Sequence, residues 1–208
     1  VLVGMLVSVF NDGMEAVSGA EGIGKVSAGL CALILIYAAF PIAQVVRSAG
    51  DSLASSKSAM VDFVFKDVVV ESIKLFGHIA ALTALFGAIC SLVGWILGSS
   101  GMMGGVDLHE VFPYLYGLPA SAMAAFMGML GLEFVGGVIE GFLSWDVTGS
   151  EASGYTVDGA LAVGWEFVQV VIILAKLYVV LVFYHFFWGV LNTFFNWIKS
   201  PYLPFKSS

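Results

Sequence analysis

Long runs of hydrophobic residues alternate with short polar segments along this chain. The longest runs lie within residues 26–46, 75–98, 113–145 and 160–198. A helix needs roughly 20 mainly apolar residues to cross a bilayer, and these runs lack the period-two alternation of transmembrane β-strands. Because only helices and closed barrels satisfy every backbone group in lipid, the pattern predicts an all-α, polytopic integral membrane protein.

The spacing of the runs predicts about four transmembrane helices in a single membrane domain that covers residues 1–208. Residues 1–25 form an N-terminal segment, and residues 26–46 are the first span. The last span lies in residues 160–198, and its final part is rich in aromatic residues, as in the belts at membrane–water interfaces.

The segment 59–98 combines a charged stripe with an apolar run. Four polar residues recur at helical spacing on one face ahead of the second span; they are Asp67, Glu71, Lys74 and His78. The stripe predicts an amphipathic helix at the membrane interface, followed by the second span. No helix breaker separates the two parts, so one long helix that emerges from the membrane is an equal alternative.

Residues 113–145 allow two topologies. A plain third span leaves the basic residues balanced between the two sides of the membrane. A re-entrant hairpin, broken near Gly128 and Gly131, places all but Lys25 of the informative basic residues on one side, as the positive-inside rule favours; these are Arg47, Lys57, Lys66, Lys199 and Lys206. Re-entrant backbone is tolerated only where protein or water covers it. We therefore expect four spans and retain three spans plus a hairpin at 113–145 as the alternative.

Composition supports a membrane protein and excludes nucleic acid as a partner. Hydrophobic residues make up 60% of the chain and charged residues 11%, against about 25% charged in soluble domains. The net charge is −7, whereas phosphate backbones require clustered lysine and arginine. Cys31 and Cys90 both fall within apolar runs and are expected to be small buried side chains. We expect an integral protein of a bacterial inner membrane or an organellar membrane, with lipid and other membrane subunits, or copies of itself, as partners.

Three ionisable residues fall within the predicted spans: Glu133, Glu140 and Lys176. A charged side chain in hydrocarbon costs at least roughly 2.5–3.5 kcal/mol, so it faces protein or water and usually has a partner. Pairing of Glu133 or Glu140 with Lys176 would serve an ion or proton path. The same pairing is also explained by a fixed ion pair that sets helix register, or by contact with another subunit.

Two histidines, His78 and His185, lie in apolar stretches of different predicted spans. Such a pair could ligate haem b from opposite faces, which makes haem the one cofactor to consider. Ordinary hydrogen-bonded histidines explain the pattern equally, and no metal site is expected.

Motifs of known enzymes are missing from the sequence. Residues 19–25 read GAEGIGK, but Val26 follows where a P-loop requires Ser or Thr, and no strand precedes the segment. There is no nucleophile elbow, HExxH or CxxC. We therefore expect a protein that is not an enzyme.

Small residues recur at four-residue spacing in the apolar segments, which lets helices approach closely. The candidate packing residues are Gly94, Gly98, Gly137 and Gly141, with a further row at Ala80, Ala84 and Ala88. Together these features favour a non-catalytic subunit of a larger membrane complex, of the secretion, motor or respiratory type. The alternatives are an ion- or proton-translocating channel, transporter or stator-like element that uses Glu133 and Lys176, and a haem-bearing or quinone-linked anchor that uses His78 and His185.

Overall fold

The computed structural model describes residues 2–99, 118–144 and 155–199, and all the regular elements in these residues are helices. This confirms the all-α prediction for the described part of the chain. In chain order the elements are α1 (Leu2–Gly19), α2 (Ile23–Ser55), α3 (Met60–Asp62), the π-helical η1 (Phe63–Val68), α4 (Val69–Ile96), α6 (Leu118–Met129), α7 (Glu133–Ser144) and α8 (Val157–Lys199).

Three helices are long and apolar enough to cross a membrane. They cover Ile23–Ser55, Met60–Ile96 and Val157–Ile198, with 33, 37 and 42 residues. At 1.5 Å per residue they extend about 50, 55 and 63 Å, beyond the roughly 30 Å of a bilayer's hydrocarbon core. The predicted fourth segment, 113–145, contributes no comparable helix among its described residues.

Two of these helices are longer than the runs that predicted them. α2 continues through Pro41 and past residue 46 to Ser55. Its polar end includes Arg47 and Asp51, whose Nε and Oδ2 atoms lie 3.7 Å apart, one helical turn from each other. The charged stripe and the second span form one continuous helix, α3–η1–α4, which is the long-helix alternative. A helix can continue beyond its apolar run where its polar side chains reach the interface or water instead of hydrocarbon.

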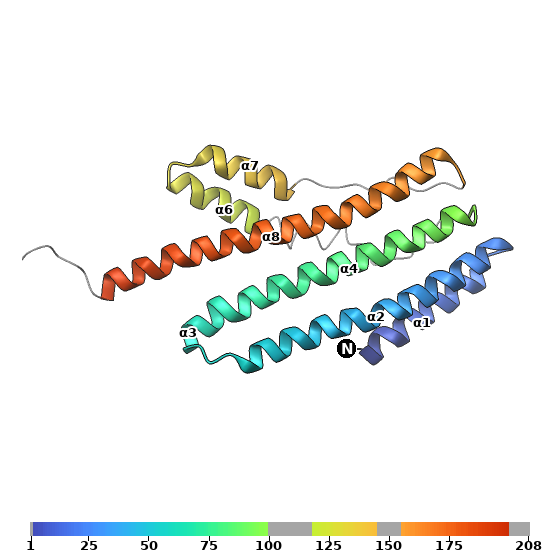
Figure 1. Cartoon of the computed structure of the whole chain (residues 1–208), viewed down its shortest axis with the longest axis horizontal. Coiled ribbons are helices and arrows are strands. Elements are labelled where there is room, and N and C mark those ends of the chain that lie inside the picture. Colours follow the sequence, from blue (N-terminus) through green and yellow to red (C-terminus); the bar gives the residue numbers. More distant parts are fainter. Residues whose placement is uncertain (1, 100–117, 145–154, 200–208) are drawn as a thin grey trace, which may run out of the picture.

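The long helices lie side by side in one open layer (Figure 1). α1 packs on α2, α2 packs on α4, and α4 packs on α8. α2 and α8 lie on opposite sides of α4 and do not pack extensively on each other, so the row does not close into a bundle (Figure 1).

The contact between α4 and α8 is the most extensive in the layer. Gly77 of α4 leaves room for Leu177 of α8, which is fully buried, and a Cβ at Gly77 would lie 2.4 Å from Leu177 Cδ1. At one end of the pair, Trp95 Nε1 donates a hydrogen bond to the Thr156 carbonyl oxygen at 2.8 Å. At the other end, the rings of Phe65 and Trp188 stack with centroids 5.7 Å apart. These contacts establish that α4 and α8 are antiparallel.

Small and aromatic side chains join α2 to α4. Cys31 and Cys90 are buried, and their sulfur atoms lie 3.7 Å and 3.9 Å from each other's carbonyl oxygens. Tyr37 and Phe86 meet edge to face, with ring centroids 6.0 Å apart. The two cysteines are free thiols, in agreement with the expectation of small buried side chains.

The α6–α7 pair forms a short hairpin against the second half of α8 (Figure 1). Each arm has 12 residues, about 18 Å. Gly131 ends α6 with φ at +75°, and the bonds from Leu132 N to Met127 O and from Gly131 N to Gly128 O form a Schellman motif.

Side chains of the hairpin pack on α8 through a small apolar cluster. The buried members are Ile139 and Leu143 of α7 and Val180 of α8. Phe126 and Phe187 add an edge-to-face contact with centroids 4.9 Å apart.

The four predicted packing glycines have different environments. Gly94 is buried within α4, whereas Gly98 adopts φ at +65° in the Schellman turn that ends this helix. Gly137 and Gly141 are exposed, and apart from the adjacent backbone of α7 no described atom lies within 4 Å of a Cβ at either position. The close approach of α4 and α8 occurs instead at Gly77.

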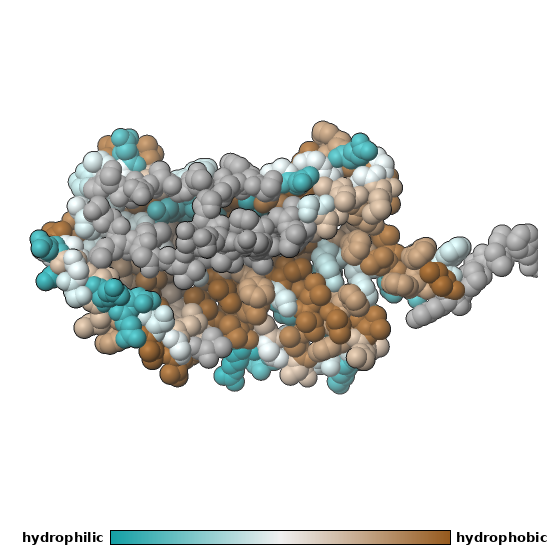
Figure 2. Space-filling view, turned by 180° about the vertical axis from the view of Figure 1, so that it is seen from behind, coloured by the Kyte–Doolittle hydropathy of each residue, from teal (hydrophilic) through white to brown (hydrophobic). Residues whose placement is uncertain are grey.

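Large hydrophobic side chains cover much of the outside of the layer. Val171 and Val182 of α8 are each 66% exposed, and Leu33 of α2 is 63% exposed. Brown hydrophobic residues dominate the lower half of the face shown in Figure 2, with teal residues in small separate groups. Such a surface is suited to lipid or to other apolar protein surfaces.

Candidate functional site

Lys176 projects from the middle of α8 to the end of α7. The side chain is only 7% exposed, and its Nζ donates a hydrogen bond to the Leu143 carbonyl oxygen at 3.2 Å. Leu143 lies in the last turn of α7, where carbonyl groups have no partner within the helix and carry the negative end of the helix dipole. The ammonium group of Lys176 therefore anchors the hairpin to α8.

The two predicted acidic partners of Lys176 lie at different distances from it along α7. Glu133 starts α7, ten residues before Leu143, which corresponds to about 15 Å along the axis. Its side chain is exposed and makes no hydrogen bond or ion pair with any other described residue. Glu140 lies one turn before Leu143, so it is the carboxylate that α7 carries toward Lys176. An ion pair between Glu140 and Lys176 stays a prediction.

The two predicted haem ligands lie at different levels of the layer. His78 follows Gly77, which packs on Leu177, whereas His185 lies eight residues beyond Leu177 along α8. This corresponds to about 12 Å along the axis. Each Nδ1 donates to a carbonyl oxygen of its own helix at 2.7 Å, from His78 to Lys74 and from His185 to Leu181. The structure therefore does not bring the two rings together around one iron.

A polar group that the sequence analysis did not single out lies inside the layer. Glu166 of α8 is half-buried beside Ser91 and Cys90 of α4. Glu166 Oε2 and Gln169 Nε2 are buried and have no hydrogen-bond partner among the described residues. A buried polar atom without a hydrogen-bond partner costs about 1–3 kcal/mol of stability. A ligand, a bound proton or another chain would lower this cost.

A polar cleft opens where α2, α4 and α8 meet at one end of the layer. It is open to solvent on one side and has a volume of about 370 Å³, within the range of small-ligand sites. The charged stripe of α4 forms one wall, the end of α2 forms the second, and His185 contributes from α8. Its lining residues are Ser52, Ser56, Lys57, Ser58, Lys66, Asp67, Val70, Glu71, Lys74 and His185.

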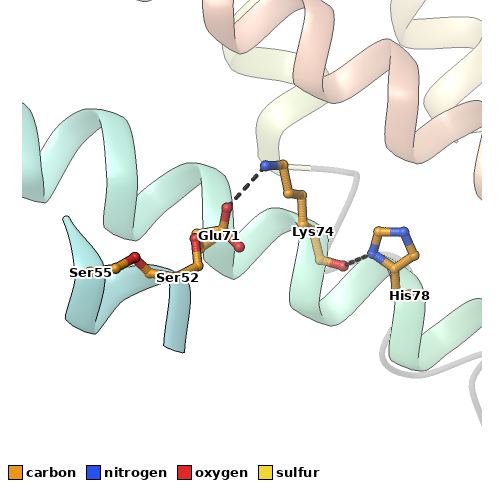
Figure 3. Close-up of polar contacts among 5 residues, drawn as sticks. All are labelled: Ser52, Ser55, Glu71, Lys74 and His78. Carbon is orange, nitrogen blue, oxygen red and sulfur yellow. Dashed lines mark hydrogen bonds and ion pairs between the residues drawn. The ribbon is translucent and has the colours of Figure 1, made fainter. Parts of the chain in front are cut away.

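Hydrogen bonds within the cleft hold both of its carboxylates. Asp67 Oδ2 accepts hydrogen bonds from the hydroxyl groups of Ser56 and Ser58, the latter at 2.6 Å. Glu71 Oε1 lies 3.0 Å from Lys74 Nζ, as Figure 3 shows, and Ser52 of α2 lines the same cleft. The carbonyl group of Lys74 in turn accepts the bond from His78, so the polar stripe continues down α4 (Figure 3).

No group of three or more metal-ligating side chains occurs among residues 2–99, 118–144 and 155–199. No protein-family model, curated protein or solved structure matches the chain.

Part of this polar chemistry has a signal in the sequence. Glu166 and Gln169 are polar residues three positions apart in an otherwise apolar segment, the pattern that singled out Lys176. The stripe on α4 is also visible from spacing alone. The meeting of that stripe with Lys57 and His185 has no local signal, because it depends on how three helices pack.

Replacing Lys176 with Met should loosen the hairpin. Met keeps the length and apolar stem but cannot donate to the Leu143 carbonyl group, so about 1.5–3 kcal/mol of interaction is lost. We expect amides in the last turn of α7 to exchange with deuterium roughly tenfold to hundredfold faster in lipid nanodiscs. Lys176→Arg, which retains a cationic donor, is the control and should preserve most of the protection. Equal exchange in the wild type and Lys176→Met would mean that the bond does not hold the hairpin.

Proposed function

We propose that the chain is a non-catalytic membrane-embedded subunit of a larger membrane-protein complex. The observation that carries this proposal is the open layer of α1, α2, α4 and α8. Among the described residues these helices form a row that encloses no pathway, and many large apolar side chains are exposed on its outside. The half-buried Glu166–Gln169 pair supports the same proposal, because partner helices would supply the missing hydrogen bonds.

Within this proposal, α2, α4 and α8 cross the membrane and residues 118–144 do not. Because α4 and α8 are antiparallel, the end of α4 and the start of α8 lie on the same side of the membrane. The segment between them therefore leaves from this side and returns to it. The basic residues then fall on one side: Arg47, Lys57, Lys66 and Lys74, with Lys199 at the end of α8. Among the basic residues in the described part of the chain, only Lys25 lies at the opposite end of the layer. By the positive-inside rule, the end of the layer that holds the polar cleft faces the cytoplasm or its organellar equivalent.

The α6–α7 pair is a re-entrant hairpin in this topology. Each arm is about 18 Å long, too short for the roughly 30 Å hydrocarbon core. The end of such a helix would expose carbonyl groups to lipid, which costs several kcal/mol per group. At the end of α7, Lys176 donates a hydrogen bond to the Leu143 carbonyl oxygen, and α8 packs against this end of the helix. Both contacts lower the cost for α7.

A second candidate function is ion or proton translocation. It is favoured by Glu166, a carboxylate inside a span with one buried oxygen atom that lacks a partner among the described residues. Such a group can bind a proton or a cation reversibly at low structural cost. Glu133 fits this role less well, because its side chain is exposed at the start of a short helix.

The subunit proposal predicts the mass of the protein in its native membrane. Extraction into polymer-bounded native nanodiscs should yield particles whose protein mass exceeds the 22.0 kDa of this chain by at least one partner or a second copy. Denaturing mass spectrometry of the same particles would identify the partner. A homogeneous population of single chains would contradict the proposal.

The translocation proposal predicts a selective effect of Glu166→Gln. The change removes the ionisable group and keeps the size of the side chain, so proton or sodium flux into sealed vesicles that contain the native complex should fall to the level of empty vesicles. Glu133→Gln is the matched control and should leave flux unchanged. If the Glu166→Gln variant keeps the flux of the wild type, Glu166 has a structural role. The same conclusion follows if the wild type shows no flux above empty vesicles.

A further inference from the structure

The polar cleft at the end of the layer has the charge of an anion site. Three lysines line it, Lys57, Lys66 and Lys74, against two carboxylates, so basic groups exceed acidic groups even with His185 neutral. Lys57 lies in the linker that follows α2, whereas Lys66 and Lys74 lie on the continuous helix α3–η1–α4, and all three line the same cleft of about 370 Å³.

The carboxylates in the cleft are already engaged by neighbouring side chains. Ser56 and Ser58 donate to Asp67, and Lys74 pairs with Glu71. Lys66 acts on Asp67 electrostatically, but neither it nor Lys57 makes an ion pair within the described part of the chain. Two ammonium groups therefore remain available to a ligand at the rim, with the Ser52 side chain exposed beside them.

We propose that this cleft binds an anionic phosphate group, held by Lys57 and Lys66. Lysine is a common phosphate ligand that acts as a compact point charge. A lipid headgroup and a free phosphate share this chemistry. The cleft lies where the polar end of α2 meets the stripe of α4, at the end of the layer assigned to the basic side of the membrane. Anionic lipids concentrate in the corresponding leaflet, where each nearby lysine contributes about 1 kcal/mol of attraction.

The lipid source rests on the membrane placement proposed above, but not on the subunit role. The phosphate chemistry rests on the cleft alone. A monomer in native nanodiscs would therefore refute the subunit proposal and leave the anion site intact.

The test is native mass spectrometry of the purified full chain in detergent. Phosphatidic acid is titrated as the anionic probe and phosphatidylcholine as the zwitterionic control, each with and without inorganic phosphate. We expect the protein to retain phosphatidic acid in preference to phosphatidylcholine. The double change Lys57→Gln with Lys66→Gln should weaken retention roughly 25-fold, about fivefold for each lysine. Lys25→Gln, at the opposite end of α2, is the matched control and should have no effect.

Two further variants separate binding from folding. Glu71→Gln removes a negative charge from the wall and releases Lys74, so retention of phosphatidic acid should increase, which a damaged fold would not produce. Ser52→Phe fills the rim without a change in charge and should reduce retention. Circular dichroism checks that each variant keeps its helices.

The outcomes assign the source of the phosphate or overturn the site. Selective retention that inorganic phosphate does not displace identifies a lipid headgroup, whereas displacement identifies a soluble phosphate. Equal retention of the two lipids together with no effect of phosphate would overturn the proposal. An equal loss in Lys25→Gln and the double variant would also overturn it, because the attraction would then be nonspecific.

Discussion

Hydrocarbon offers no hydrogen bonds to a polypeptide, and this constraint determines the form of the whole molecule. A helix satisfies its backbone internally except at its ends, and the three long helices have the length to place their ends beyond an apolar core of roughly 30 Å. The α6–α7 hairpin cannot do so, because its arms are short. An apolar cluster packs it on α8, and Lys176 donates a hydrogen bond from α8 to a terminal carbonyl group of α7.

The same constraint gives each polar group in the layer a different role. Lys176 meets its requirement within the chain and is best explained as an anchor. Glu166 and Gln169 each have one buried atom without a hydrogen-bond partner in the described residues, and a neighbouring subunit or an ion would supply one. The charges of the cleft lie at one end of the layer and include more lysines than carboxylates, which favours an anion. Lys176, the Glu166–Gln169 pair and the cleft thus lie in separate parts of the layer.

Much of the architecture is predictable from apolar periodicity, because the length of an apolar run directly limits whether a helix spans a bilayer. The helical class and the long helices in the first, second and last segments follow from it. The path of 113–145 does not, since the length of that run suits a span while the glycines and the basic residues suit a hairpin. In the described part of this segment, Gly131 ends α6 in a left-handed conformation.

A four-residue pattern does not reveal Gly77, because its role depends on Leu177 of a helix that is distant in the sequence. The stripe on α4 and the burial of Lys176 could be anticipated, but the contact of Lys176 with a carbonyl oxygen and the meeting of the stripe with α2 required the packed structure.

Side-specific labelling of single cysteines tests the three-crossing layer most directly. In a background with Cys31→Ala and Cys90→Ala, single cysteines would replace Ala59, Glu21 and Val157, which lie at the ends of the long helices. A membrane-impermeant thiol reagent applied to oriented vesicles should label Ala59→Cys from one side only, and Glu21→Cys and Val157→Cys from the other side only. Labelling of Val157→Cys from the same side as Ala59→Cys would mean that residues 113–145 cross the membrane, and would contradict the account.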